Sequence, residues 1–281
     1  MKEIRAQEIT RVVAEICQQA NYELGDDVLT ALEEAQQKEK SKLARYALEK
    51  IIQNAALAKQ KGLPLCQDCG TAVIFLEIGQ DVHITRGDIN KAIVEGVYQG
   101  YRKGYLRKSM VNNPLSTRMN TGDNTPPVVN IRIVPGNRLK IAVMPKGGGT
   151  ENASRLAMLK PGVGNKGVVD VVVKTIDEVG ANPCPPLIIG LGIGGTAEKA
   201  MLLAKEALLR KLGEFNPDPE VARLEKDILD RVNDLGIGAL GLGGSITALA
   251  VHAEVFPAHI ASLPVAINLQ CHSARHREVI L

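Results

Sequence analysis

The spacing of apolar residues changes at residue 62, and this change sets the fold class. Before it, five small or apolar residues recur at the spacing of an amphipathic helix: Ile9, Val13, Ile16, Cys17 and Ala20. A second helix is expected from Asp26 or Asp27, either of which would cap it, and a third over 41–59. Beyond residue 62, short apolar runs alternate with glycine-rich loops and further helices. The sequence therefore predicts an α+β (mixed α/β) fold, in which a helical N-terminal layer packs on a small mixed β-sheet with Gly-rich loops.

The later elements follow each other without a repeat or a clear linker, so one domain is expected over 1–281, with 1–61 as its helical subregion. Strands are expected at 73–76, 128–134, 139–144, 186–190 and 262–268. Helices are expected at 87–104, 146–159, 168–179, 196–212 and 219–235. Residues 135–137, Pro-Gly-Asn, predict a turn between two of the strands, and the Asn-, Thr- and Pro-rich residues 112–127 predict a loop.

Composition excludes several classes of protein. Aromatic residues make up 3% of the chain and Trp is absent, so the core must be aliphatic. A net charge of +3 without a basic, aromatic-interleaved run argues against nucleic acid as a partner. No apolar run approaches 18 residues, and the charged N-terminus does not resemble a secretory signal, so no membrane partner is expected. Five irregularly spaced cysteines indicate a reducing compartment, and we expect the cytoplasm.

Two glycine-rich segments follow predicted strands. Residues 190–195, Gly-Leu-Gly-Ile-Gly-Gly, match the dinucleotide-binding pattern but lack the second strand and acidic residue that the fingerprint requires. The alternatives are a tight turn with close helix–strand packing, or an anion cradle at a helix N-terminus. Residues 146–150, Lys-Gly-Gly-Gly-Thr, offer a similar cradle and do not form a Walker motif. Together they make a carboxylate or phosphate ligand plausible.

Residues 66–69, Cys-Gln-Asp-Cys, hold two thiols, an amide and a carboxylate. A structural zinc site of the four-cysteine type would need a second C-x-x-C pair, which the chain lacks, and a redox dithiol would need a following helix, where a β-branched run follows instead. Cys17 lies on the apolar stripe of the first helix and is expected to be core.

Three thiols from distant segments are expected in loops: Cys66, Cys184 and Cys271. Prolines flank Cys184, and the cationic surroundings of Cys271 favour its thiolate. Three thiolates can bind a [4Fe–4S] cluster and leave one iron open to substrate. Unrelated buried cysteines are the alternative that the spacing alone leaves open.

Six segments in order resemble the α subunit, or N-terminal domain, of the iron–sulfur (class I) fumarate hydratases. They are 64–71 (Pro-Leu-Cys-Gln-Asp-Cys-Gly-Thr), 120–126 (Asn-Thr-Gly-Asp-Asn-Thr-Pro), 146–152 (Lys-Gly-Gly-Gly-Thr-Glu-Asn), 182–186 (Asn-Pro-Cys-Pro-Pro), 190–196 and 235–238 (Leu-Gly-Ile-Gly). Tartrate dehydratase α subunits share the Cys-Gln-Asp and Cys-Pro-Pro elements, whereas 120–126 and 146–152 look more like the fumarase branch. The resemblance implies hydration of fumarate to malate, a step of the tricarboxylic acid cycle, on an oxygen-sensitive [4Fe–4S] cluster with one open iron, bound by Cys66, Cys184 and Cys271.

The resemblance also implies roles for single residues. Asp68, next to a ligand cysteine, would be the proton donor to the departing hydroxyl. Arg107 matches the family's substrate arginine, and its guanidinium suits a carboxylate. Gln67 and the Gly149 amide would add hydrogen bonds, and His259 matches a family histidine near the substrate. The other histidines are expected to be structural or at the surface.

One position departs from the family pattern: Cys69 stands where Thr is usual, and is expected to pack or hydrogen-bond in place of the hydroxyl. The family's base for C–H removal lies in a β subunit, so the chain alone is expected to catalyse little, and a heterotetramer or larger assembly is expected. Two rival interpretations remain: a related hydro-lyase α subunit acting on L(+)-tartrate or another dicarboxylate, and a non-catalytic scaffold subunit that binds an anion or binds zinc through Cys66 and Cys69.

Overall fold

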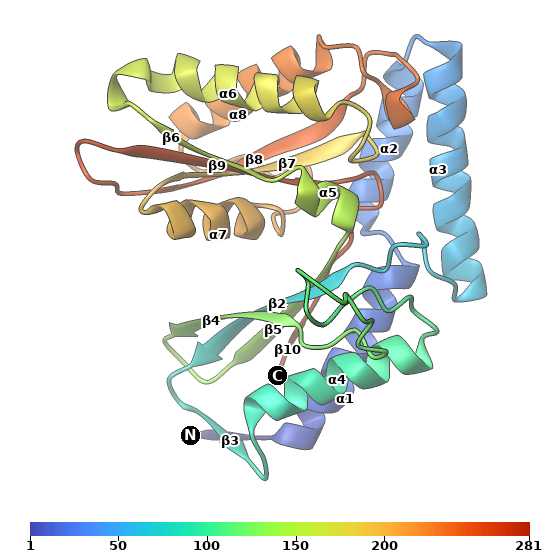
Figure 1. Cartoon of the computed structure of the whole chain (residues 1–281), viewed down its shortest axis with the longest axis vertical. Helices are drawn as coiled ribbons and strands as arrows, with labels where there is room; N and C mark the ends of the chain where they lie inside the picture. The colour runs from blue at the N-terminus through green and yellow to red at the C-terminus, as the bar shows by residue number, and fades with distance from the viewer. The chain divides into compact units, whose positions relative to one another are not determined.

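A computed structural model describes all residues, 1–281, and divides the chain into two compact units. Unit 1 comprises Met1–Leu24, Ala55–Gly148 and Arg275–Leu281; unit 2 comprises Gly25–Asn54 and Gly149–Ala274. The single domain over 1–281 stays a prediction. Figure 1 labels the elements. No helix combines the length and the apolar character needed to cross a membrane.

Unit 1 consists of a sheet with two helices on one face (Figure 1). Its elements are β1 (Lys2–Arg5), α1 (Ala6–Tyr22), β2 (Thr71–Gly79), β3 (Val82–Thr85), α4 (Ile89–Lys103), β4 (Val128–Val134), β5 (Leu139–Lys146) and β10 (Arg277–Ile280). The main sheet has the order β10-β5-β2-β4, and β1 pairs with β3 in a separate ribbon. Mixed pairing within this sheet, with β4 parallel and β5 antiparallel to β2, agrees with the predicted class.

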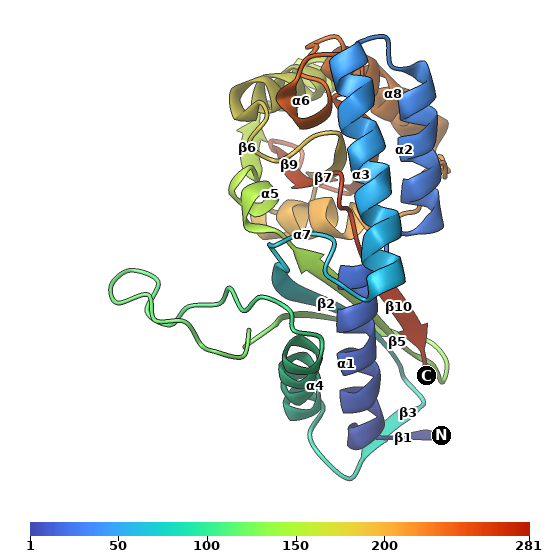
Figure 2. The ribbon, with the colours of Figure 1, turned by 90° about the vertical axis from the view of Figure 1, so that its right-hand side faces the viewer.

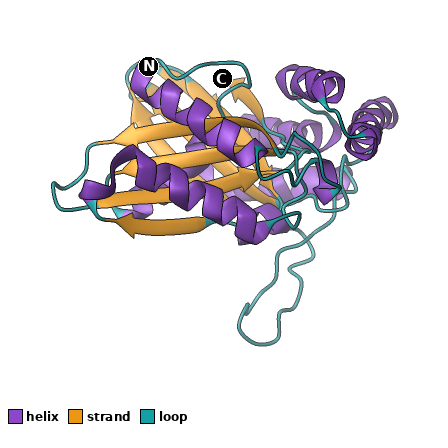
Figure 3. Cartoon of the chain, turned by 90° about the horizontal axis from the view of Figure 1, so that it is seen from above, coloured by secondary structure: helices purple, strands orange, loops and turns teal.

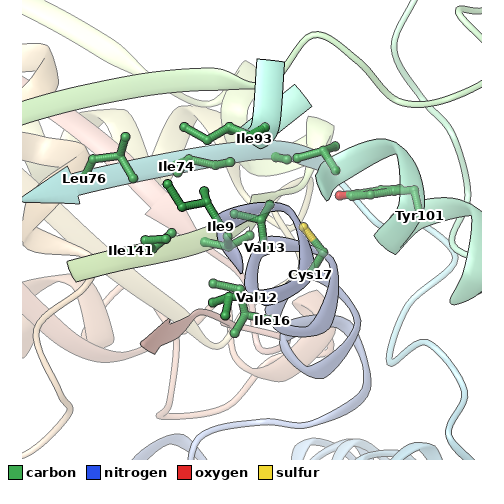
Figure 4. Close-up of a cluster of buried hydrophobic side chains, with 14 of the residues drawn as sticks. Ile9, Val12, Val13, Ile16, Cys17, Ile74, Leu76, Ile93, Tyr101 and Ile141 are labelled. Carbon is green, nitrogen blue, oxygen red and sulfur yellow. The ribbon is translucent and has the colours of Figure 1, made fainter. Parts of the chain in front are cut away.

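The core of unit 1 is aliphatic, as the composition requires. Ile9, Val13 and Ile16 of α1 meet Ile74 of β2 and Ile93 of α4 (Figure 4). The stripe predicted for the first helix is therefore the buried face of α1, and Cys17 lies on it, fully buried as expected. Asp88 caps α4 by accepting a hydrogen bond from the Lys91 backbone N–H at 2.8 Å, which fixes where this helix begins.

The turn at 135–137 is present, but the strands on either side of it do not pair with each other. β2 lies between them, so the turn passes around the end of β2. Backbone N–H groups of Gly79, Gln80 and Asp81 donate to the carbonyls of Arg138, Val134 and Gly136, each at 2.9 Å. A Cβ on Gly79 would lie 2.3 Å from the Gly136 carbonyl oxygen, so this crossing requires glycine.

Unit 2 places a second sheet, of order β6-β9-β7-β8, between helices on both faces (Figure 1). Its elements are α2 (Asp26–Lys38), α5 (Gly148–Asn152), β6 (Arg155–Leu159), α6 (Gly164–Val179), β7 (Leu187–Gly194), α7 (Ala197–Ala207), α8 (Pro219–Asn233), β8 (Ala248–Phe256) and β9 (Leu263–Gln270), with short 3-10 turns at Pro161–Val163 and Ala239–Gly241. Helix α3 (Lys42–Lys61) has residues in both units. Helices α6 and α8 share a core with one face of the sheet, and α7 covers the other.

Three expectations for this unit are corrected. Residues 155–159 form the strand β6 rather than continuing a helix, because they pair with β9, and the helix at Gly148 ends at Asn152. In the segment 190–195 the correction is partial: Gly190 and Gly192 lie inside β7, and only Gly194 and Gly195, with φ of +91° and +69°, lie at its end. The expected close helix–strand packing is present, because a Cβ on Gly190 or Gly192 would lie 2.1 or 1.9 Å from a carbonyl oxygen of α7. Neither Asp26 nor Asp27 caps α2, which begins after Gly25; Asp27 instead accepts a hydrogen bond from the Leu212 N–H at 2.9 Å.

The predicted loop at 112–127 belongs to a longer irregular segment between α4 and β4. In Figures 2 and 3 it extends away from the helices and sheet of unit 1. Leu115 and Met119, within this segment, are exposed.

Candidate active site

Two backbone amides hold the carboxylate of Asp68 in unit 1, one from its own cysteine loop (residues 66–70) and one from Gly148. Asp68 Oδ1 accepts from the Gly70 N–H at 2.9 Å, and Oδ2 accepts from the Gly148 N–H at 2.7 Å. The Asp68 N–H in turn points at Cys66 Sγ, 3.4 Å away. This brings the predicted acid, a predicted ligand thiol and the start of the 146–150 glycine segment together. The carboxylate is only partly buried, so it is accessible to a small ligand.

Two buried side chains from other segments of unit 1, Tyr101 and Asn124, donate hydrogen bonds to backbone carbonyls of this loop. The Tyr101 hydroxyl donates to the carbonyl oxygens of Cys69 at 2.7 Å and Gly70 at 3.1 Å. Asn124 Nδ2 donates to the Gly70 carbonyl at 3.0 Å, while its Oδ1 accepts from the Ser109 N–H at 2.7 Å. Gly70 itself has a φ of +70°, and a Cβ there would lie 2.7 Å from the backbone N of Lys146, so no other residue fits.

Cys69 is buried beneath the loop and links it to the segment that carries Arg107. Its Sγ accepts from the Arg107 N–H at 3.2 Å and lies 3.7 Å from the Cys66 carbonyl oxygen, to which it donates. Burial raises the pKa of the Cys69 thiol, against the smaller opposing effects of the Arg107 N–H and the Arg275 charge. The hydrogen-bonding role expected for a thiol at the usual Thr position is what the geometry shows.

Two predicted substrate ligands lie on exposed side chains of unit 1. Arg107 is exposed and its guanidinium makes no ion pair, and Gln67 is exposed on the cysteine loop. The Cys69–Arg107 hydrogen bond ties their backbones to the same loop. An unpaired guanidinium beside a carboxylate-bearing loop suits an anionic ligand.

Arg275 is a site residue that the sequence analysis missed. It is 4% exposed, and its Nη2 donates to the Asp68 carbonyl oxygen, while Nε and Nη1 have no hydrogen-bond partner. A buried guanidinium with free donors is costly unless an anion lies nearby. Its place in the cationic stretch after Cys271 is visible in the sequence, but nothing there indicates contact with a loop 207 residues away.

In unit 2, two of the predicted ligand cysteines lie in adjoining loops. The His272 N–H, next to Cys271, donates to the Cys184 carbonyl at 3.2 Å. Cys184 is exposed and has a φ of +58°, a backbone conformation that residues other than glycine rarely adopt. A turn supports it, because the Cys184 N–H donates to the Ala181 carbonyl at 3.0 Å. Strained backbone of this kind is concentrated at functional sites.

Gly149 adjoins the same pair of loops. A Cβ on Gly149 would lie 3.3 Å from the Asn182 carbonyl oxygen, two residues before Cys184. Asn268, near the end of β9 and fully buried, donates to Ser154 Oγ at 2.8 Å and so fixes the segment after α5 to the strand that leads to Cys271. Unit 2 therefore collects three of the predicted segments at one end of its sheet.

His259 lies elsewhere in unit 2. It precedes β9, whereas Cys271 follows that strand, and an eight-residue strand spans about 26 Å. The side chain is exposed, and its Nδ1 accepts from the Ala261 N–H at 3.1 Å, which leaves Nε2 as the donor nitrogen. The structure thus does not bring His259 to Cys184 and Cys271 within this unit, and its role stays a prediction.

Comparison with known proteins decides the family. The family model described as Fumarate hydratase (Fumerase) matches residues 10–280. The chain belongs to this family. A protein of Methanocaldococcus jannaschii named "Putative L(+)-tartrate dehydratase subunit alpha" is 44% identical over 273 residues, which is 95% of each chain. The L(+)-tartrate dehydratase subunit alpha of Escherichia coli (strain K12) is 30% identical over 284 residues, covering all of this chain and 93% of its own length.

The fumarate hydratase family consists of hydro-lyases, so this chain is a hydro-lyase subunit whose chemistry removes or adds water at a carbon–carbon bond. Of the residues that the family resemblance singled out, Cys66, Gln67 and Arg107 lie with Asp68 in unit 1, Gly149 and Cys271 lie near Cys184 in unit 2, and His259 lies apart from them.

The donor set fits the iron–sulfur cluster that the family implies. None of the five cysteines forms a disulfide; Cys184 is exposed and Cys66 and Cys271 partly so, whereas Cys17 and Cys69 are buried. The three accessible thiols are the three predicted ligands. An N–H group directed at Cys66 Sγ is typical of thiolates that bind iron–sulfur clusters. The structure places no group of three His, Cys, Asp or Glu side chains together in a position to hold a metal ion.

Proposed function

We propose that this chain is the α subunit of a two-subunit [4Fe–4S] fumarate hydratase, which hydrates fumarate reversibly to (S)-malate in the cytoplasm as a step of the tricarboxylic acid cycle. The observation that carries the proposal is the division among the cysteines, in which the accessible thiols are Cys66, Cys184 and Cys271. These three would hold the cluster. When bound, its open iron would supply Lewis-acid activation of the substrate hydroxyl.

Asp68 is the proposed proton donor to the departing hydroxyl. Its two amide contacts, at Gly70 and Gly148, hold the carboxylate in one orientation, which is the condition for efficient proton transfer. In the hydration direction the carboxylate of Asp68 would take the proton from water. Arg107 would bind a substrate carboxylate, since its guanidinium is exposed and unpaired. Gln67, the Gly149 amide and His259 are proposed to complete the contacts to the substrate.

The proposed partner is a β subunit that supplies the base for C–H removal. Both relatives described above are named as α subunits. The groups that contact Asp68 within unit 1 are the Gly70 and Gly148 amides, the Cys66 thiol and Arg275, and none of them is a carboxylate or an imidazole. A heterotetramer or larger assembly, with little activity in the α chain alone, follows from the proposal.

Anaerobic reconstitution tests the proposal directly. The chain should take up about four irons with matching sulfide and turn brown. With its β chain added, the complex should convert fumarate to malate, while the α chain alone should not. A colourless chain that binds one zinc through Cys66 and Cys69 would establish the scaffold alternative, and full activity from the single chain would contradict the half-site arrangement.

L(+)-tartrate is the second candidate substrate, because the relatives of this chain are named for its dehydration. Steady-state kcat/KM of the two-chain complex on malate and on L(+)-tartrate distinguishes the two. A higher kcat/KM for tartrate would replace fumarate in the proposal while leaving the roles of Cys66, Cys184, Cys271 and Asp68 unchanged.

A further inference from the structure

The β4 edge of the unit 1 sheet exposes large apolar side chains. Ile131 is 53% exposed and Ile133 is 71% exposed. In the register of the sheet they lie beside Leu76 and Ile78 of β2, on the face that α1 and α4 cover over the rest of the sheet. The core face therefore continues to this edge without a covering element.

The two edges of this sheet differ in how they are protected. β10, at the opposite edge, has four residues and carries Arg277 and Glu278, the second of which pairs with Lys140 at 2.7 Å. Short length and charge are the usual protection of an edge strand. β4 has seven residues, no proline, and Arg132 as its only charge. An edge of this kind is a template for another strand.

The sequence of β4 is complementary to itself. We propose that two copies of this chain pair antiparallel through β4, about a twofold axis at Ile131. The opposed residues would be Val128 with Val134, Val129 with Ile133, Asn130 with Arg132, and Ile131 with its own copy.

Every opposed pair in this register matches in chemistry. Apolar residues meet apolar residues on both faces, and the charge of Arg132 meets the amide of Asn130 rather than another arginine. On its own chain, Arg132 lies 3.8 Å from Glu77 on the same face of the sheet. A twofold axis is the commonest symmetry of homodimers, and here it would join two four-stranded sheets into one of eight strands. A shift by one residue would place the core-facing residues Ile131 and Ile133 of the two copies on opposite faces of the joined sheet, so the register is specific.

The first test is the association state of the full chain alone, measured by sedimentation equilibrium. The wild type should dimerise, and Ile131→Lys should weaken the dimer about tenfold or more, because two ammonium groups would meet at the axis. Met158→Lys is the matched control: Met158 is 58% exposed on β6, an edge strand of the other sheet, and its substitution should leave the dimer unchanged.

The second test fixes the register. Under mild oxidation Ile131→Cys should form a disulfide-linked dimer, since the Cα atoms of directly opposed residues lie within disulfide range. Ile133→Cys, two residues away and more exposed, should not link to itself, because it faces Val129 of the other copy. Peptide mass spectrometry of the linked species, with the wild type as background, identifies the 131–131 bond.

Three results would overturn the proposal. These are a monomeric wild-type chain that assembles only with its β subunit, a dimer that Ile131→Lys does not weaken, and equal cross-linking at positions 131 and 133. The proposal does not depend on the hydro-lyase reaction, so an outcome for one leaves the other untouched.

Discussion

The cysteine loops of the two units are held by different means. In unit 1, side chains from three separate segments, Tyr101, Asn124 and Arg275, all donate to carbonyl oxygens of residues 68–70, and all three are buried. In unit 2, the loops of Cys184 and Cys271 meet through a backbone hydrogen bond, and Cys184 is exposed with a positive φ.

Under the proposed function, unit 1 would position the acid together with one ligand thiol, Cys66, and unit 2 would supply the other two thiols. The Asp68 loop is fixed by the fold of unit 1, which suits a carboxylate that must keep one orientation through the reaction. The loops of unit 2 leave their thiols accessible, which suits ligands whose final arrangement is completed when a cluster binds. The predictions below test this contrast, from the largest expected effect to the smallest.

Removing an accessible thiol should abolish cluster binding. Cys184→Ser or Cys271→Ser should lower the iron content of the anaerobically reconstituted chain from about four to near background, because serine is a poor ligand for iron in such clusters. Cys69→Ser is the matched control, since it keeps a hydrogen-bonding group at a buried position. Loss of iron in the control, or retention in both variants, would contradict the division between accessible and buried thiols.

Asp68→Asn should leave the cluster in place and lower kcat of the two-chain complex by about 10²–10⁴, the usual contribution of a general acid. KM should change less, since the amide keeps the size of the side chain. Asp88→Asn is the control: Asp88 caps α4 in the same unit, and asparagine caps equally well, so kcat should stay at the wild-type value. A fall in iron content together with kcat would show that Asp68 supports the loop rather than the reaction.

The sequence predicted those features of the molecule that depend on contacts between residues close together in the chain. Local patterns predicted the helices around Ile9 and Ile93 and the strand after the cysteine loop, because each depends on a short-range period. The loop positions of Cys66, Cys184 and Cys271 made them one candidate set for a cluster, and the family resemblance favoured this set over unrelated buried cysteines. By contrast, the separation of β4 from β5 depends on hydrogen bonds from Gly79, Gln80 and Asp81 around the end of β2, which no local pattern encodes.

Arg275 and Asn124 show the same limit within the site. Each donates to a carbonyl of the Asp68 loop from a segment more than 50 residues away, at 54 residues for Asn124 and 207 for Arg275. Their residue types are common in loops, so only the folded chain reveals their contacts. The sequence predicts a helix over 146–159, whereas residues 155–159 form β6 for a related reason: the pairing with β9 overrides their local preference.

Mild acid should destabilise unit 2 before unit 1, because His252 is buried in its sheet. Burial and, less strongly, the charge of Arg210 lower the pKa of His252 from 6.5 to about 4, against a hydrogen bond to Ala207 and the charge of Asp27. In the unfolded chain His252 becomes protonated below pH 6.5, whereas in the folded chain it becomes protonated only at about pH 4. The free energy of unfolding should therefore be complete above pH 6.5 and fall by about 3 kcal/mol as the pH drops to 4.

The measurement is hydrogen exchange of peptides from each unit between pH 6.5 and 4, corrected for intrinsic exchange rates. In His252→Gln the pH dependence of β7 and β8 protection should flatten. In His83→Gln, at an exposed position on β3 of unit 1, it should remain. Equal pH dependence in the wild type and His252→Gln would exclude this histidine as the source.

Tyr101→Phe should have the smallest effect and the most local one. The substitution removes the hydroxyl that donates to the Cys69 and Gly70 carbonyls, while Asn124 still donates to Gly70. The expected loss is about 1 kcal/mol in the free energy of unfolding. Hydrogen exchange should become faster in residues 66–71 and should stay unchanged in the loops of unit 2. Tyr46→Phe, at an exposed position on α3, should change neither quantity. If Tyr101→Phe leaves exchange in the Asp68 loop unaltered, the loop is held by its backbone, as in unit 2, and the contrast between the two units fails.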